Sequence, residues 1–185
     1  MKGFTRSDLF FSLCGLNCGL CTMHVDGHCP GCGGGAGNQS CKLARCSLAH
    51  GEPEYCSQCQ EFPCKSYEKI DESDSFITHY NQKKDLKKQE EAGAEAYQRE
   101  QKEKTDILSW LLENYNDGRK KSFFCLAVNL LELQELRRIR QQISQHEEIN
   151  RLTIKEKAAF VSRLLQDQAD KNQIVLKLRR KKRQT

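Results

Sequence analysis

The sequence has little of several features that common protein classes need. No proline follows Pro63, the chain has a single tryptophan, and only 8% of its residues are aromatic. No apolar run approaches the roughly 18 to 20 residues that a membrane-spanning helix needs. The short apolar run at residues 9–13 is too short for the hydrophobic region of a secretory signal, and no cleavage pattern accompanies it. We therefore expect a cytoplasmic protein without a membrane span.

A nucleotide-binding motif is also missing, although glycines are frequent near the N-terminus. Gly31, Gly33, Gly34, Gly35 and Gly37 follow one another closely, but no Gly-Lys-Ser/Thr completes a phosphate-binding loop and no strand pattern precedes them. We interpret them as loop glycines that let backbone amides turn toward sulfur atoms.

Cysteine is the residue type that the sequence has in excess. Ten of the eleven cysteines fall between residues 14 and 64, and three pairs have the spacing C-x2-C. Two such pairs can form the tight knuckles of a tetrahedral four-sulfur site, so we predict that the clustered cysteines are metal ligands. They are Cys14, Cys18, Cys21, Cys29, Cys32, Cys41, Cys46, Cys56, Cys59 and Cys64.

Zinc is the metal that this pattern favours, because repeated knuckles are its usual frame and closed zinc sites stabilise small folds with a weak core. Ten thiols exceed the eight that two zinc ions need, and the spacing alone does not assign partners. Three histidines in the same segment, His24, His28 and His50, are alternative ligands, but a lone loop histidine is more often solvated. Disulfides are disfavoured because thiols stay reduced in the cytoplasm.

An iron-sulfur cluster is the main alternative to zinc. Cys14, Cys18 and Cys21 have the C-x3-C-x2-C spacing by which radical S-adenosylmethionine enzymes hold a 4Fe-4S cluster. Leu20 stands where an aromatic residue is usual, and the repeats of a barrel are absent, so that enzyme class is disfavoured. An electron-transfer or redox-sensing cluster remains open, although the ferredoxin spacing is missing. We predict no catalytic residue: Cys125, the remaining cysteine, lies in an apolar run and is interpreted as a small core residue.

Composition divides the chain into three predicted parts. Residues 1–66 form a small, irregular, metal-stabilised cysteine-rich module like a zinc knuckle, because they lack the aliphatic residues of a core. Residues 67–170 form an all-α domain rich in Glu, Lys, Gln and Leu. Helices are predicted over 76–104 with a hinge at Gly93, over 106–115, over 122–143, and after a capping box of Thr153 and Glu156.

The third part, residues 171–185, is a basic tail with seven basic and no acidic side chains. Such a cluster can neutralise phosphates, although a solvated chain end has the same composition. The predicted contacts to a nucleic acid or protein partner are Lys177, Arg179, Arg180, Lys181, Lys182 and Arg183.

Several runs of the sequence resemble a cysteine-rich bacterial and archaeal family that is catalogued as domain of unknown function 3795. The runs are CGLNCGLCTMH, CPGC, CKLARCSLAHG and CSQCQEFPCKSYEKI, and NDGRKKSFFCLAVNLLELQEL resembles the helical extension of longer members. The resemblance implies that the ten clustered cysteines are metal ligands, most often for zinc, and it implies no activity. We therefore expect a non-catalytic module that binds two zinc ions on a helical scaffold and contacts another macromolecule.

Overall fold

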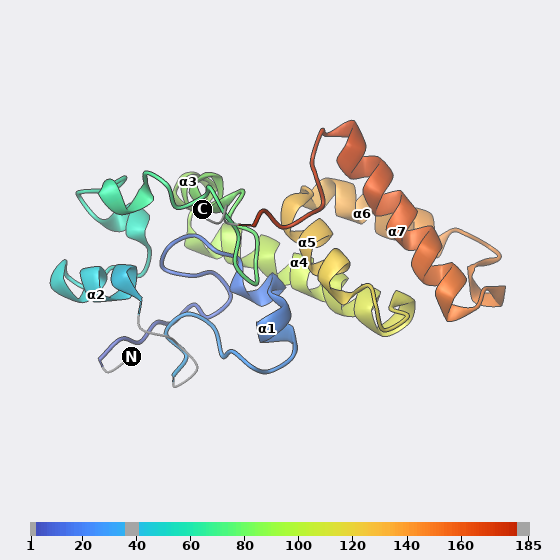
Figure 1. Cartoon of the computed structure of the whole chain (residues 1–185), viewed down its shortest axis with the longest axis horizontal. Helices are drawn as coiled ribbons and strands as arrows, with labels where there is room; N and C mark the ends of the chain where they lie inside the picture. The colour runs from blue at the N-terminus through green and yellow to red at the C-terminus, as the bar shows by residue number, and fades with distance from the viewer. Residues whose placement is uncertain (1–2, 36–40, 181–185) are drawn as a thin grey trace, which may run out of the picture. The chain divides into compact units, whose positions relative to one another are not determined.

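The computed structural model describes residues 3–35 and 41–180, and over these residues the fold is all-helical, without a strand (Figure 1). The predicted helical class is thereby confirmed, whereas the zinc-knuckle character of the N-terminal part stays a prediction. The α helices are α1 (Thr22–Val25), α2 (Lys42–Ala49), α3 (Gln82–Ala92), α4 (Ala94–Tyr115), α5 (Lys121–Leu130), α6 (Leu133–Ser144) and α7 (Ile154–Lys171). Short 3-10 helices are η1 (Cys18–Leu20), η2 (Cys56–Gln58), η3 (Lys65–Tyr67) and η4 (Ile149–Arg151).

The described residues form two compact units. The first comprises the residues up to Gln101 together with Leu178–Arg180, and the second comprises Lys102–Lys177. The first unit thus contains α3 and the start of α4 as well as the cysteine-rich segment. The predicted boundaries after residues 66 and 170 rest on composition and stay predictions.

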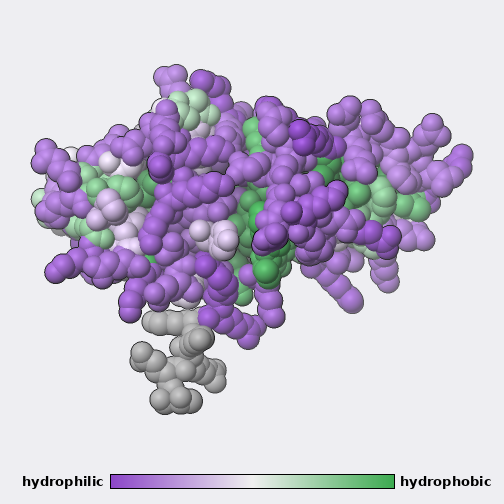
Figure 2. All heavy atoms as spheres, turned by 90° about the horizontal axis from the view of Figure 1, so that it is seen from above, coloured by the Kyte–Doolittle hydropathy of each residue, from purple (hydrophilic) through white to green (hydrophobic). Residues whose placement is uncertain are grey.

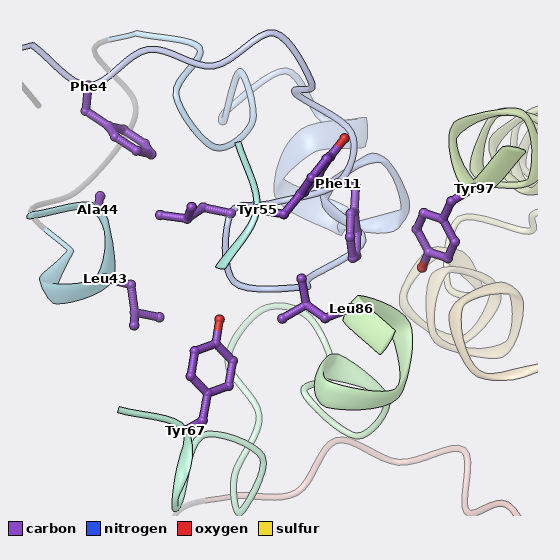
Figure 3. Close-up of a cluster of buried hydrophobic side chains, with 9 residues drawn as sticks. Phe4, Phe11, Leu43, Ala44, Tyr55, Tyr67, Leu86 and Tyr97 are labelled. Carbon is purple, nitrogen blue, oxygen red and sulfur yellow. The ribbon is translucent and has the colours of Figure 1, made fainter. Parts of the chain in front are cut away.

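A cluster of buried aromatic and aliphatic side chains forms the core of the first unit (Figure 3). Phe11 lies at its centre, with ring centroids 5.7 Å from Tyr55 and 4.6 Å from Tyr97. Leu86 of α3 and Tyr97 of α4 belong to the same cluster, so the cysteine-rich segment shares its hydrophobic core with the helices that follow it. Four half-buried cysteines pack against the same cluster: Cys14, Cys32, Cys56 and Cys64.

The second unit is a helical domain in which α7 packs against α5 and α6. Its buried residues include Leu108, Phe124, Leu136, Val161 and Leu165. Cys125 is also buried there, as predicted for a small core residue. The side chains of α5, α6 and α7 supply a conventional hydrophobic core that involves none of the clustered cysteines.

The helix boundaries confirm some predictions and correct others. The break at Gly93 and the capping box of Thr153 and Glu156 are present, with the Glu156 carboxylate accepting the Thr153 N–H at 2.8 Å. The single helix predicted over 122–143 was wrong, because the chain leaves α5 at an extended, fully buried Leu131 and restarts at Glu132. The separate helices predicted on either side of residue 105 are one continuous helix, α4.

The surface is mostly hydrophilic on the face that Figure 2 shows, with hydrophobic areas between the polar side chains. Within residues 3–35 and 41–180, no helix is long and apolar enough to cross a membrane.

Candidate metal centre

Four of the predicted ligands line one hollow in the first unit. Cys46 comes from α2, Cys56 from η2, and Cys59 and Cys64 from the loop that leads to η3. The other residues of the wall are Leu43, Ser47, His50, Pro53, Phe62 and Tyr67, and the hollow has a volume of about 350 Å³ with its opening to solvent included. We call these four cysteines the distal set. The arrangement brings together thiols that are as far apart as 18 residues in the sequence.

The Tyr67 side chain is the most unusual feature of this hollow. Its hydroxyl is buried and has no partner that meets hydrogen-bond geometry, which is costly for a polar group. The hydroxyl nevertheless lies beside Cys56 and lowers the pKa of that thiol. Burial has the larger effect, and the pKa of Cys56 is raised to about 12. Burial and the neighbouring Cys56 in turn raise the pKa of Tyr67, so its proton stays available for donation. A buried donor beside a thiol suits a sulfur that carries negative charge.

His50 lines the hollow and contacts Cys46, one of the distal cysteines. Its Nδ1 lies 2.8 Å from the Cys46 carbonyl oxygen and 3.5 Å from Cys46 Sγ. Its Nε2 lies 3.7 Å from an exposed Glu61 carboxylate oxygen. These contacts occupy both ring nitrogens, which is consistent with a supporting role beside four sulfurs.

A second set of thiols, the proximal set, consists of Cys14, Cys18, Cys32 and Cys41. Burial raises the pKa of Cys14, the Ser12 hydroxyl opposes that shift by a hydrogen bond, and Cys32 and Cys41 add to it, which brings the pKa to about 11. Burial also raises the pKa of Cys18, as do Cys32 and Cys14. Cys14 therefore lies within electrostatic reach of Cys32 and Cys41, and Cys18 within reach of Cys14 and Cys32.

The CGLNC loop that carries Cys14 and Cys18 is held against α3. Gly15 has a φ of 94°, and a Cβ at this position would overlap the Gln82 carbonyl oxygen, so glycine is required. The Gln82 side-chain amide donates to the Cys14 carbonyl oxygen at 2.9 Å, and Asn17 donates to Asp85 at 2.8 Å. These contacts fix the backbone around two of the proximal thiols.

Arg6 is a functional candidate that the sequence reasoning missed. Its side chain is only 1% exposed, and its Nη1 donates to the carbonyl oxygens of Asp8 at 2.9 Å and Phe11 at 2.8 Å. Its Nη2 forms an ion pair with Glu54 at 3.4 Å but has no hydrogen-bond acceptor, and the guanidinium lowers the pKa of Cys32 against the larger effect of burial. No motif marks Arg6 in the sequence, because its role depends on folding against Glu54 and Cys32.

The remaining two predicted ligands, Cys21 and Cys29, neighbour each other outside both sets. Burial raises the pKa of Cys21, the backbone N–H groups of Met23 and His24 oppose that shift, and the charge of Cys29 adds to it. Cys21 is also a neighbour of Cys18, so the pair adjoins the proximal set. Similarly, Cys56 lies within electrostatic reach of Cys14, so the two sets adjoin each other.

All ten clustered cysteines are free thiols. Over residues 3–35 and 41–180, no group of three or more His, Cys, Asp or Glu side chains is arranged so that it could hold a metal ion. The donor chemistry fits a soft cation, because each set consists of thiols alone and has an unpartnered buried donor beside it.

The basic tail is partly engaged inside the first unit. The Arg179 guanidinium donates to Asp74 Oδ1 at 2.7 Å, its backbone N–H donates to Asp74 Oδ2 at 2.6 Å, and its guanidinium stacks over Tyr80 at 5.2 Å. Lys177 and Arg180 are exposed. Lys181, Lys182 and Arg183 lie outside the described residues. Arg179 is therefore committed to an internal contact.

Comparison with known proteins adds no relative: no protein-family model, no curated protein and no solved structure matches the chain.

Proposed function

We propose that the first unit is a non-catalytic metal-binding module in which Cys46, Cys56, Cys59 and Cys64 hold one zinc ion. The observation that carries the proposal is the convergence of these four thiols on a single hollow. A closed site of four thiolates has no open position for a substrate, so the ion would stabilise the fold and would not activate water. The residues have separate tasks in such a site. The four cysteines bind, and Tyr67 orients one of them.

The unpartnered Tyr67 hydroxyl is the independent support for this proposal. A buried hydroxyl without an acceptor costs about 1 to 3 kcal/mol. A metal-bound Cys56 thiolate would accept its hydrogen bond, because ligand sulfurs keep negative charge and are commonly held by surrounding donors. The proposal thus explains why a tyrosine stands where a phenylalanine would pack as well.

An iron-sulfur cluster is the second candidate. The wall of the hollow consists mainly of sulfur, aromatic and aliphatic groups, and cysteine thiolates are also the ligands that hold such clusters. In that case the module would serve electron transfer or redox sensing.

Elemental analysis and a visible spectrum of anaerobically purified protein separate the two candidates. Colourless protein that contains zinc supports the first, and brown protein that contains iron and sulfide supports the second. Cys56→Ser should then lose one metal centre, and the control Cys125→Ser should keep full metal content because Cys125 lies in the core of the other unit. Unchanged metal content in Cys56→Ser would overturn both candidates.

We further propose that the module and its helical scaffold contact another macromolecule, with nucleic acid as the partner that the basic tail favours. Lys177 and Arg180 are exposed, whereas Arg179 is committed to its ion pair with Asp74. Replacing Lys177 and Arg180 together by alanine should reduce the salt dependence of binding to a labelled duplex by about two phosphate contacts. Fluorescence anisotropy across a salt series measures this, and the absence of any binding by the full chain would exclude the nucleic-acid partner.

A further inference from the structure

We propose that α6, together with the short turn before it, reads double-stranded DNA, and that its exposed side is the surface that enters the major groove. The proposal is separate from the metal module, because it concerns the second unit alone. It rests on the proposed nucleic-acid partner in one respect, since both require the chain to bind nucleic acid. It differs in the residues that make the contact and in the form of nucleic acid that they fit.

A very short connection presents α6. Between α5 and α6 only Leu131 and Glu132 are extended. Leu131 is fully buried, and the Glu132 N–H donates to the Glu135 carboxylate at 3.0 Å, so the turn is fixed on both sides. Two helices with a short turn between them are a common support for a helix that docks in a groove of DNA.

One side of α6 is buried and the other is exposed. The buried side packs in the core of the second unit, where α7 lies alongside α6 (Figure 1). At about 100° per residue, the exposed glutamines lie along the middle of the opposite side, with one arginine to either side of them. We call this surface the reading face, and its residues are Gln134, Arg137, Arg138, Gln141 and Gln145.

The reading face carries positive charge without acidic partners on its own helix. Residues 136–146 include three arginines and no acidic side chain. Other helices balance their charges internally: Lys87 pairs with Glu91 at 3.6 Å in α3, and Lys102 pairs with Asp106 at 3.5 Å in α4. No arginine of α6 has an acidic residue four positions away. The face is therefore complementary to a row of phosphates.

The arginines are placed so that they can meet phosphates. The Arg137 guanidinium donates to Glu103 of α4 at 2.6 Å and 2.5 Å, but the two side chains are 46% and 37% exposed. An ion pair this exposed contributes little stability, so a phosphate can replace the carboxylate. Arg138 is exposed and bonds to no acceptor in residues 3–35 and 41–180, so it can contact a phosphate directly.

The glutamines add what a phosphate contact lacks, which is discrimination between bases. A glutamine amide can donate to and accept from adenine at once in the major groove. None of the three amides of the reading face forms a side-chain hydrogen bond with another described residue. The major groove of B-form DNA is about 12 Å wide and admits one α-helix, whereas that of A-form RNA is too narrow. The face therefore fits duplex DNA.

Fluorescence anisotropy of the full chain with a labelled mixed-sequence DNA duplex, measured across a salt series, tests the charge contact. Arg138→Gln should reduce the slope of log affinity against log salt by about 0.9 and weaken binding by about 8-fold at about 0.1 M salt, because one phosphate contact is lost. Arg163→Gln is the matched control, since it removes the same charge from an exposed position of α7. Equal losses in the two variants would overturn the proposal.

The same titrations separate this proposal from the proposed partner. Binding that depends on Lys177 and Arg180 but not on Arg138 would leave the nucleic-acid partner standing and overturn the role of α6. Equal affinity for an RNA duplex of the same sequence would overturn the reading of the major groove. Equal displacement by polyglutamate at the same charge concentration would assign the face to an acidic protein and would also overturn the proposal.

Selection from a random-sequence duplex library tests the glutamines. Wild type should enrich a preferred sequence, and Gln141→Ala should lose about 5-fold to 150-fold of discrimination at one base pair, the value of one bidentate base contact. Gln166→Ala is the control, because Gln166 lies on α7 and bonds to Asp170 at 2.8 Å. It should enrich the wild-type sequence unchanged. Failure of wild type to enrich any sequence would overturn the reading role.

Chemical modification of wild type provides a test that does not depend on the folding of variants. Phenylglyoxal reacts with exposed guanidinium groups, and peptide mapping locates the modified arginines. Saturating DNA duplex should protect Arg138 and leave the reaction of Arg163 unchanged, because only the first lies on the reading face. Reaction of Arg138 at the same rate with and without DNA would overturn the proposal.

Discussion

Two buried polar side chains lie beside candidate ligand cysteines. Tyr67 and Arg6 both retain a donor without an acceptor in a region where burial makes that costly. Packing alone does not explain Tyr67, because phenylalanine would fill the same space, and Arg6 keeps a spare donor even after its hydrogen bonds to the Asp8 and Phe11 carbonyl oxygens. A charged sulfur beside each donor does explain them, so these two residues deserve the first substitutions.

Replacing Tyr67 by phenylalanine should have opposite effects without and with metal. In metal-free protein the change removes an unsatisfied hydroxyl, so the free energy of unfolding should stay the same or rise by about 1 kcal/mol. In metal-loaded protein it removes a donor to Cys56, so metal affinity should fall by about 10-fold. Denaturant unfolding and chelator competition measure the two quantities.

Tyr55→Phe is the matched control, because the Tyr55 hydroxyl donates to Asp8 at 2.9 Å and has a satisfied role. It should destabilise metal-free and metal-loaded protein alike, by about 1 kcal/mol. If Tyr67→Phe behaves as Tyr55→Phe does, the hydroxyl of Tyr67 has a structural partner and no link to the metal.

Glycine substitutions separate backbone strain from close packing. Gly27 and Gly31 both have positive φ values, 71° and 99°, so alanine is strained at either position by about 1 kcal/mol. At Gly27 nothing lies within 4 Å of a new Cβ, whereas at Gly31 the new atom would overlap the Leu9 carbonyl oxygen. Gly31→Ala should therefore destabilise the first unit by clearly more than Gly27→Ala, and chemical denaturation followed by tyrosine fluorescence should report the difference. Equal effects would mean that the CPGC loop is not packed on residues 6–9 as described.

At the scale of elements, the segment at residues 178–180 depends on one buried carboxylate. The Asp74 side chain is 1% exposed and accepts hydrogen bonds from Arg179, from the His79 N–H at 2.7 Å and from the Thr78 hydroxyl at 3.4 Å. Asp74→Ala should cost about 2 kcal/mol and release the segment, because several donors lose their acceptor at once. Asp71→Ala is the control, since Asp71 pairs with a partly exposed Lys83 and should cost no more than about 0.5 kcal/mol. Hydrogen exchange at residues 178–180 should rise in the first variant and not in the second.

The same contact should give the segment a defined acid limit. Burial alone would raise the pKa of Asp74, but hydrogen bonds from Arg179 outweigh it and lower the pKa below the usual value of 3.8. A lowered pKa means that the stabilisation is fully present above the unfolded value of about 3.9 and is lost as the pH falls through the lower folded value. Protection of the segment should thus persist at pH 5 and disappear only below about pH 4. Loss of protection near pH 6 would contradict this assignment, because the Asp74 carboxyl stays ionised at that pH.

Local signals in the sequence predicted the elements that depend on local contacts. The capping box at Thr153 and the break at Gly93 are such cases, because neighbouring residues decide them. The break at Leu131 was not predictable from periodicity, since Leu131 continues the apolar pattern while its backbone turns extended to fill the core. The ten thiols were visible as candidates from their spacing, but the gathering of Cys46 with Cys56, Cys59 and Cys64 at one hollow depends on how the chain folds. Arg179 and Asp74, which are 105 residues apart, left no sequence signal at all.

At the scale of the whole molecule, the two units rest on different kinds of stabilisation. The second unit has a core of leucine, valine and phenylalanine side chains that needs no cysteine ligand. The first unit has a core cluster against which Cys14, Cys32, Cys56 and Cys64 pack, so any change in the state of these thiols acts directly on the core. Metal binding and folding should consequently be coupled in the first unit alone.

Removal of metal should therefore unfold one unit and spare the other. A structural zinc ion contributes on the order of 10 kcal/mol in small zinc domains, more than a small core can replace. After complete chelation, hydrogen-exchange protection should be lost at residues 41–67 and should persist in α5, α6 and α7, because the side chains that bury those helices include none of the clustered cysteines. Readdition of zinc should restore protection, and readdition of magnesium, which prefers oxygen ligands, should not. Unchanged exchange at residues 41–67 after the metal is gone would mean that Phe11, Tyr55 and their neighbours hold the unit together unaided, and that any bound ion serves a purpose other than stability.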